Sequence, residues 1–263
     1  MEEYGYLLFI AIVLISTKCL GLVTKRFHMP QVVGALVAGL IIGPACLNLS
    51  SIMLVGESNS MIHSLSEIGV IVLMFSAGLE TDIQKLKKSG LASLVIALLG
   101  VIVPCVGGAL IAHFFTDSTG ITAEAAMYRN IFIGVILTAT SVSITVETLK
   151  ELGKLKTKSG NAILGAAIID DVLGIIALTL VTSMADESVK ISVVLLKIVA
   201  FFAFAGVIGF IFYKVFKKWT GQAEKGLRRH AIMAFVFCLL MAYVAEKFFG
   251  VADITGAFIA GLI

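Results

Sequence analysis

The sequence is poor in charge and in cysteine, and each shortage excludes a class of protein. Only 14% of its 263 residues are charged, whereas 59% are hydrophobic and the mean hydropathy is +1.06. A soluble domain of this length cannot bury so much apolar surface, so lipid must be the solvent for much of the chain. The four cysteines stand in separate apolar stretches without paired spacing, which excludes a disulfide framework or a cysteine metal motif. The basic residues form no patch interleaved with aromatics, so no nucleic-acid partner is expected.

Long apolar stretches, by contrast, follow one another along the whole chain. Each is about 20 residues long, the length that a helix needs to cross the hydrocarbon core of a bilayer. A segment in lipid must satisfy its own backbone groups, so we expect helices, and the alternating pattern of an outer-membrane barrel is absent. The stretches lie at 4–23, 30–46, 61–79, 91–115, 130–149, 160–183, 191–213 and 231–249, with another beginning at Asp253. The sequence therefore predicts an all-α polytopic membrane protein with about nine spans.

Basic residues alternate between the loops that join these spans. Most of the 20 lysines and arginines follow an odd-numbered span. They are Lys25, Arg26, Lys85, Lys87, Lys88, Lys150, Lys154, Lys156, Lys158, Lys214, Lys217, Lys218, Lys225, Arg228 and Arg229. Because cytoplasmic loops retain lysine and arginine, we expect these loops to face the cytoplasm and the N-terminus to lie outside. The expected location is the cell (inner) membrane. The acidic start of the chain does not match a signal peptide, so the first span should be retained.

Two segments far apart in the sequence are nearly the same. GALVAGLI at residues 34–41 and GAFIAGLI at residues 256–263 are identical at six of eight positions, 222 residues apart. The second copy begins the ninth span, seven spans after the first copy in the second span, and an odd offset reverses the direction across the membrane, as in an inverted-topology repeat. Counterparts of the third to sixth spans would then follow Ile263, which predicts a parent protein of about thirteen spans. Chance recurrence of small residues in membrane helices is the alternative.

Two adjacent carboxylates, Asp170 and Asp171, lie within the otherwise apolar stretch GAAIIDDVLGII. An ionised aspartate near the bilayer centre costs roughly 2.5–3.5 kcal/mol, so its presence indicates a function. Neighbouring helical residues point about 100° apart, so one carboxylate should face a water-filled cavity and the other a partner on another helix. Hard oxygen ligands suit Na⁺ or a similar small cation. The alternative is that the pair stabilises helix packing through hydrogen bonds.

The fifth span carries an unusual number of hydroxyl groups. Its sequence LTATSVSITVETL places Thr138, Ala139, Thr140 and Ser141 near the middle of the membrane. Hydroxyls compete for backbone groups and β-branched residues are weak helix formers, so we expect this helix to break locally. Broken helices expose carbonyl oxygens and helix ends where transporters bind ions. The alternative is that the hydroxyls bond back to an unbroken helix.

Taken together, these stretches resemble the cation:proton antiporter superfamily, specifically the Kef-like branch of sodium/proton exchangers. The likeness covers nearly the whole chain. The matching segments are MPQVVGALVAGLIIGP (29–44), GVIVLMFSAGLETD (69–82), TATSVSITVETLKELGKLKTKSG (138–160), AILGAAIIDDVLGII (162–176) and DITGAFIAGLI (253–263). The resemblance implies that residues 1–263 are the N-terminal part of an exchanger transmembrane domain, with two crossing discontinuous helices, a dimerisation domain and an elevator-like movement.

The resemblance also assigns roles to individual residues. Asp171 matches the aspartate that binds the cation and the proton, and Asp170 matches the neighbour that pairs with a basic residue on a later span. Residues 138–141 match the first broken helix. The first aspartate is typically Gln in potassium-efflux relatives, so the Asp-Asp pair favours Na⁺, with Li⁺ and K⁺ as further candidates. The basic partner and the second broken helix would lie after Ile263.

The sequence thus favours secondary transport over three other functions. We expect Na⁺ and H⁺ to compete for the two aspartates in a homodimer that needs no cofactor. An intramembrane aspartyl protease needs carboxylates opposed on two helices, which adjacent residues cannot provide. A non-transporting regulatory or assembly subunit and a sodium symporter for an organic anion are the remaining alternatives, although the visible spans offer no basic or aromatic pocket for an anion.

Overall fold

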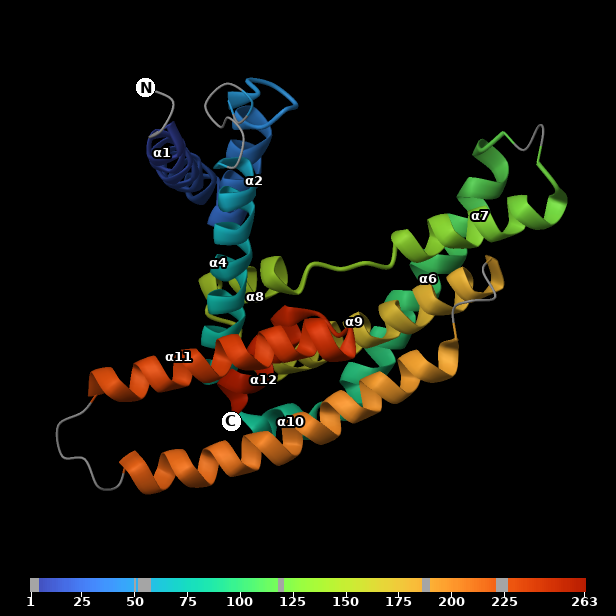
Figure 1. Cartoon of the computed structure of the whole chain (residues 1–263). Helices are drawn as coiled ribbons and strands as arrows, with labels where there is room; N and C mark the ends of the chain where they lie inside the picture. The colour runs from blue at the N-terminus through green and yellow to red at the C-terminus, as the bar shows by residue number, and fades with distance from the viewer. Residues whose placement is uncertain (1–4, 50, 52–57, 118–120, 186–189, 221–226) are drawn as a thin grey trace. The chain divides into compact units, whose positions relative to one another are not determined.

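The computed structural model describes residues 5–49, 51, 58–117, 121–185, 190–220 and 227–263, and these ranges contain helices and no strand. Figure 1 shows their arrangement. The helices are α1 (Gly5–Arg26), α2 (Gln31–Ile42), α4 (Ser58–Glu80), α5 (Ile83–Lys88), α6 (Gly90–Phe115), α7 (Ala123–Ile136), α8 (Val142–Glu151), α9 (Lys158–Ala185), α10 (Ile191–Thr220), α11 (Leu227–Val244), the π-helical turn η1 (Ala245–Phe249) and α12 (Asp253–Leu262). The prediction of an all-α polytopic membrane protein is confirmed.

Six helical segments are long and apolar enough to cross a bilayer: α1, α4, α6, α9, α10 and α11 with η1. Two further apolar helices, α2 and α12, are shorter than a bilayer crossing requires. Each helical segment nevertheless overlaps an apolar stretch of the sequence, apart from α5, which lies in a predicted charged loop. The number of crossings therefore stays a prediction.

Large apolar side chains lie on the outer surface of the long helices. On α6, Leu91, Phe114 and Phe115 are each at least 78% exposed. In water such a surface would promote aggregation, whereas in a bilayer it contacts acyl chains. The exposed apolar surface follows from the all-round hydrophobicity of these helices and agrees with a position in lipid.

The chain folds as two compact units. Unit one comprises residues 1–72 and 143–155, and unit two comprises residues 73–142 and 156–263. In unit one, α1 packs along α2 because Gly34 lets the two backbones approach closely; a Cβ at this position would overlap the carbonyl carbon of Leu20. The Gln31 N–H, at the start of α2, donates to Glu151 Oε2 at 2.6 Å and so joins α8 to α2.

Unit two is built around α6, which packs against both α7 and α9 (Figure 1). Glycine makes the first contact close, because a Cβ at Gly134 of α7 would overlap the Cys105 carbonyl oxygen of α6. The second contact is polar, since the Ser93 hydroxyl donates to the Ala162 carbonyl oxygen at 3.0 Å. These two contacts hold both α7 and α9 against α6.

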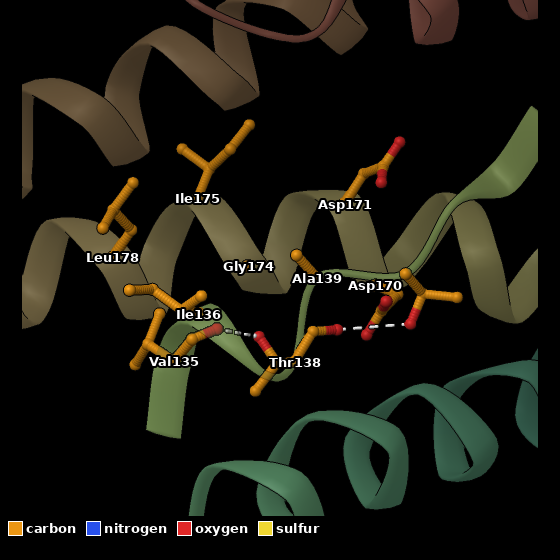
Figure 2. A pocket seen from close by; sticks show the side chains of 10 residues that line it. Val135, Ile136, Thr138, Ala139, Asp170, Asp171, Gly174, Ile175 and Leu178 are labelled. Atoms are coloured by element: carbon orange, nitrogen blue, oxygen red, sulfur yellow. Dashed lines mark hydrogen bonds between the residues drawn. The ribbon is translucent and has the colours of Figure 1, made fainter. Parts of the chain in front are cut away.

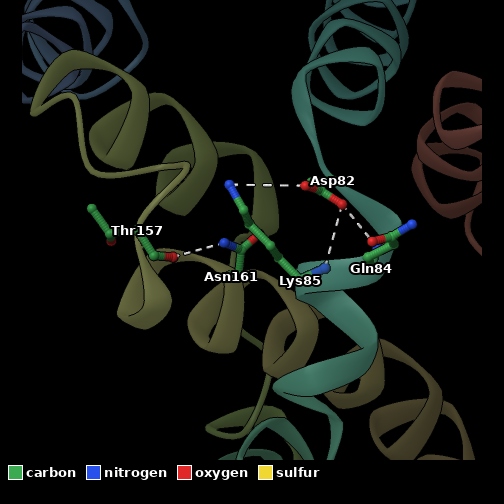
Figure 3. Close-up of polar contacts among 5 residues, drawn as sticks. All are labelled: Asp82, Gln84, Lys85, Thr157 and Asn161. Atoms are coloured by element: carbon green, nitrogen blue, oxygen red, sulfur yellow. Dashed lines mark hydrogen bonds and ion pairs between the residues drawn. The ribbon is translucent and has the colours of Figure 1, made fainter.

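The short helix α5 precedes α6 on the side where α9 begins (Figure 3). Asp82 caps its N-terminus, accepting from the Gln84 N–H at 2.9 Å, and its other oxygen lies 3.8 Å from Lys85 Nζ. On the first turn of α9, Asn161 Nδ2 donates to the Thr157 carbonyl oxygen at 2.7 Å. The Asp82 cap explains why helix α5 forms in a stretch that the sequence predicts as a charged loop.

A second helix pair in unit two, α11 and α12, is joined through η1 and a tight turn. Gly250 closes the turn with φ of 65°, a left-handed conformation that favours glycine. A Cβ at Gly256 of α12 would lie 2.5 Å from the Met241 carbonyl oxygen of α11, so only glycine permits this packing. Farther along, Gly261 packs in the same way against Gly78 of α4.

Candidate functional site

The helical path through the predicted fifth span is interrupted in the structure. Helix α7 ends at Ile136, Leu137 caps it, and α8 begins at Val142, so residues 138–141 are not helical. The Thr138 hydroxyl donates to the Val135 carbonyl oxygen at 2.8 Å, and the Thr138 N–H donates to the same oxygen at 3.0 Å. These hydroxyl and 3₁₀-type bonds tighten the last turn, which is the competition with helical bonding that the sequence predicts.

Both aspartates lie near the middle of α9, an unbroken helix of 28 residues. Figure 2 shows that their side chains leave the helix in different directions, Asp170 toward Thr138 and Asp171 away from it. Asp170 is only 8% exposed, and Asp171 is partly buried. The 100° step between adjacent helical residues thus gives the two carboxylates different surroundings.

A cavity of about 360 Å³ lies between α9 and the interrupted segment (Figure 2). It is lined by Val135, Ile136, Thr138, Ala139, Thr140, Asp170, Asp171, Gly174, Ile175 and Leu178. Oxygen-bearing side chains come from the interrupted segment and from the aspartates, while the other walls are apolar. A water molecule occupies about 30 Å³ of liquid, so the cavity has room for a small cation together with several waters.

One carboxylate oxygen of the site lacks a hydrogen-bond donor among the residues that the structure describes. Asp170 Oδ1 is buried and accepts no hydrogen bond within the described residues. On α6, a Cβ at Gly100 would lie 4.0 Å from this oxygen. A buried carboxylate oxygen without a donor is costly, so water in the cavity, a proton, a cation or a counter-charge would have to satisfy it.

The Thr140 hydroxyl lies between two acceptors. The Thr138 carbonyl oxygen is 3.2 Å away, and the Asp170 carboxylate is also within hydrogen-bonding reach. A hydroxyl carries one proton, so Thr140 can donate to only one of the two at a time and offers its lone pairs to a cation. Asp170, Asp171, the Thr140 hydroxyl and backbone carbonyl oxygens of the interrupted segment are therefore the groups that could ligate a hard cation.

The structure brings together most, but not all, of the residues that the sequence predicts for the site. Thr138, Ala139 and Thr140 line the cavity with both aspartates, whereas Ser141 is not among the lining residues. No cluster of three or more His, Cys, Asp or Glu side chains suited to a metal ion exists in the described part of the chain. The roles of the individual residues stay predictions.

Sequence reasoning missed one residue that contacts the site. The Thr255 hydroxyl, from the first turn of α12, donates to Asp171 Oδ2 at 3.5 Å. Its side chain is buried, at 2% exposure. The available signal was weak: Thr255 is the one hydroxyl in the segment DITGAFIAGLI. Nothing in the sequence indicates that this threonine contacts Asp171, 84 residues away.

Comparison with known proteins agrees with this geometry. The family model described as "Sodium/hydrogen exchanger, transmembrane" matches residues 9–263. The Na⁺/H⁺-K⁺ antiporter GerN of Bacillus cereus is 37% identical over 261 residues, covering 99% of this chain and 63% of the relative. The probable Na⁺/H⁺ antiporter GerT of Bacillus cereus is 39% identical over 257 residues, with 96% and 64% covered. A Na⁺/H⁺ antiporter of Enterococcus hirae is 37% identical over 273 residues, with 100% and 64% covered.

These relatives are named as antiporters, that is, as transporters rather than enzymes. The chain spans a little less than two thirds of the length of each. The family match, by contrast, extends over nearly every residue of the chain, including both aspartates and the interrupted segment. The chain therefore belongs to the transmembrane sodium/hydrogen exchanger family.

Proposed function

We propose that the protein exchanges Na⁺ for H⁺ across the membrane by alternating access, with the two ions competing for Asp170 and Asp171. The relatives named above are Na⁺/H⁺ antiporters, and one of them is named for K⁺ as well. Na⁺ is the first candidate, followed by Li⁺ and K⁺. The transported ions are substrates, and the proposal requires no cofactor.

The observation that supports this proposal most strongly is the pairing of the interrupted segment with the aspartates at one cavity. A cation that enters the cavity meets hydroxyl, carbonyl and carboxylate oxygens, which are the ligands that hard cations prefer. A proton that binds an aspartate removes the charge that holds the cation. Because the site holds one cargo or the other when it changes sides, competition alone couples the two fluxes.

Replacing one carboxylate tests the proposal directly. Asp171→Asn keeps the size of the side chain and removes the charge, so we expect exchange to be abolished while the protein still inserts in the membrane. The measurement is the dissipation of a pH gradient by added Na⁺ in everted vesicles from cells that produce the complete open reading frame. Immunoblotting of the vesicles controls for insertion. Exchange at the normal rate in this variant would contradict the proposal.

The larger arrangement is also proposed rather than observed. We infer that residues 1–263 are the first part of an inverted-repeat transmembrane domain that forms a homodimer in the cell membrane, with the N-terminus outside. The repeat is supported by matching contacts, because Gly34 and Gly256 occupy equivalent positions and each packs closely on the preceding helix, α1 or α11. A non-transporting assembly subunit is the second candidate, and the Na⁺ flux measurement distinguishes it.

A further inference from the structure

The hydroxyl of Thr255 differs from other buried hydroxyls near the site in what it contacts. Thr138 and Thr179 each donate to a backbone carbonyl three or four residues earlier, at 2.8 and 2.7 Å. Such bonds are the usual way to satisfy a threonine in a membrane helix. Thr255 instead reaches from α12 to Asp171 Oδ2 on α9. A hydrogen bond between side chains on separate helices satisfies the hydroxyl and also constrains the carboxylate that accepts it.

Two close helix contacts hold Thr255 in place. Its neighbour Gly256 packs on the Met241 carbonyl oxygen of α11, and Gly261 packs against Gly78 of α4. Both contacts are backbone to backbone, so α12 cannot slide or rotate without a clash. The first turn of α12 is therefore fixed at the level of Asp171, which lies near the middle of α9.

Comparison of the similar segments at residues 34–41 and 256–263 indicates whether helix packing requires the hydroxyl of Thr255. The segment match at an offset of 222 aligns Thr255 with Val33, which precedes Gly34 on α2. Valine and threonine have nearly the same shape, so the helix contact made by the next glycine does not require a hydroxyl. In α12 the residue before this glycine is Thr255, whose hydroxyl contacts Asp171.

We propose that Thr255 is a positioning residue for Asp171, an inference that rests on the proposed exchange function. By donating to Oδ2, the hydroxyl holds the Asp171 carboxylate in one orientation and leaves its remaining lone pairs for the cation. Without the hydroxyl the carboxylate rotates more freely, and binding an ion then costs additional side-chain entropy. The loss should fall on cation affinity rather than on the rate of the conformational step.

Kinetics in everted vesicles from cells that produce the complete open reading frame test this inference. Thr255→Val removes the hydroxyl and keeps the shape, and we expect the KM for Na⁺ to rise about threefold to tenfold with the maximal rate within about twofold. Thr255→Ser restores the donor and should return the KM toward the starting value. Thr179→Val is the matched control, because it removes a buried hydroxyl that bonds within its own helix.

Each outcome decides between the two proposals. An unchanged KM in Thr255→Val, or an elevated KM that Thr255→Ser does not restore, overturns the positioning role while Asp171→Asn still abolishes exchange. Normal exchange in Asp171→Asn overturns both proposals. Should Thr255→Val fail to accumulate in the membrane, Thr255→Ala is measured in its place and judged by the same KM criterion.

Discussion

Adjacent carboxylates on one helix become two different groups because of where each side chain points. Asp170 turns toward the interrupted segment and meets Thr140, and within the described part of the chain its Oδ1 accepts no hydrogen bond. Asp171 turns the other way and meets Thr255. One helical step therefore directs the first carboxylate to the interrupted segment and the second to α12. Two separate surroundings allow one aspartate to be charged while its neighbour binds a proton.

The partnerless oxygen of Asp170 leads to a prediction about Gly100. A methyl group at this position would lie at an ordinary contact distance of 4.0 Å from Oδ1, so Gly100→Ala should fold normally. It would nevertheless restrict water and cation from that oxygen. We expect the KM for Na⁺ to rise about threefold or more in vesicle assays, in line with the loss of one ion–ligand contact.

Gly107→Ala provides the control for this prediction. Gly107 is on the same helix and an added Cβ there meets no atom within 4 Å. Both substitutions change helix propensity equally, by about 1 kcal/mol in favour of alanine. A KM that is unchanged in Gly100→Ala, or that rises to the same extent in both variants, would show that access to Asp170 Oδ1 does not limit cation binding.

At the residue level, the sequence predicts the acids but not their contacts. Asp170 and Asp171 stand out because charge in an apolar run is costly and therefore selected for a purpose. Thr255 does not stand out, because one threonine in a membrane helix is inexpensive when it bonds to its own backbone. Its importance depends on which helix lies opposite, and that is decided by packing between segments far apart in the chain.

Helix interruption at residues 138–141 is a property of an element rather than of one residue. The end of α7 is held against α6, where Gly134 packs on the Cys105 carbonyl oxygen and Gly108 packs on Gly134. Because this contact fixes α7 up to its last turn, the chain can leave the helix at Leu137 without moving the rest of α7. The interruption is therefore supported by packing as well as by the hydroxyl-rich sequence.

Enlarging Gly134 should loosen this support. A Cβ in Gly134→Ala would overlap a backbone carbonyl oxygen, which cannot move aside cheaply. We expect a loss of about 1–3 kcal/mol of stability, typical of overpacking, and an apparent melting temperature lower by several degrees in detergent. Thermal aggregation of the purified protein, followed by gel filtration, gives this temperature.

The comparison for Gly134→Ala is again Gly107→Ala, which adds the same methyl group where there is space. That variant should melt at the temperature of the unaltered protein or slightly above it. If both variants melt at the same temperature, the α6–α7 contact is not as close as the structure indicates, and the interruption must depend on the hydroxyls alone.

At the level of elements, hydrophobic length predicts where helices form and local polarity predicts where one breaks. The predicted range 130–149 became α7 and α8 with the interruption between them. Helix α5 was not predicted, because two apolar residues, Ile83 and Leu86, among three lysines are too few to indicate a helical pattern. It forms because Asp82 caps it. In a sequence, a capping residue predicts the start of a helix only when a periodic apolar pattern follows it.

At the scale of the whole molecule, the lipid solvent explains why apolar side chains lie on the surface, and the charge of the loops predicts the side of the membrane on which each loop lies. Large apolar residues cover the surface of α6 and α10. Hydrophobicity therefore does not distinguish the faces of these helices that contact protein from those that contact lipid. The orientation is predicted instead from the lysines and arginines, because loops that hold many of them are retained on the cytoplasmic side of membrane proteins. The alternating charge of the loops therefore predicts a topology that can be measured without any assay of transport.

Labelling of introduced cysteines measures this topology. In a variant whose four native cysteines are alanine, Lys87→Cys and Lys156→Cys lie in loops with cytoplasmic character, and Lys190→Cys lies in a loop of the opposite set; all three positions are exposed. We expect a membrane-impermeant maleimide to label the first two in everted vesicles and the third in right-side-out vesicles. The reverse pattern would place the N-terminus inside. Labelling of Lys87→Cys and Lys156→Cys from opposite sides would mean that an odd number of crossings separates them, whereas the predicted fourth and fifth spans require an even number.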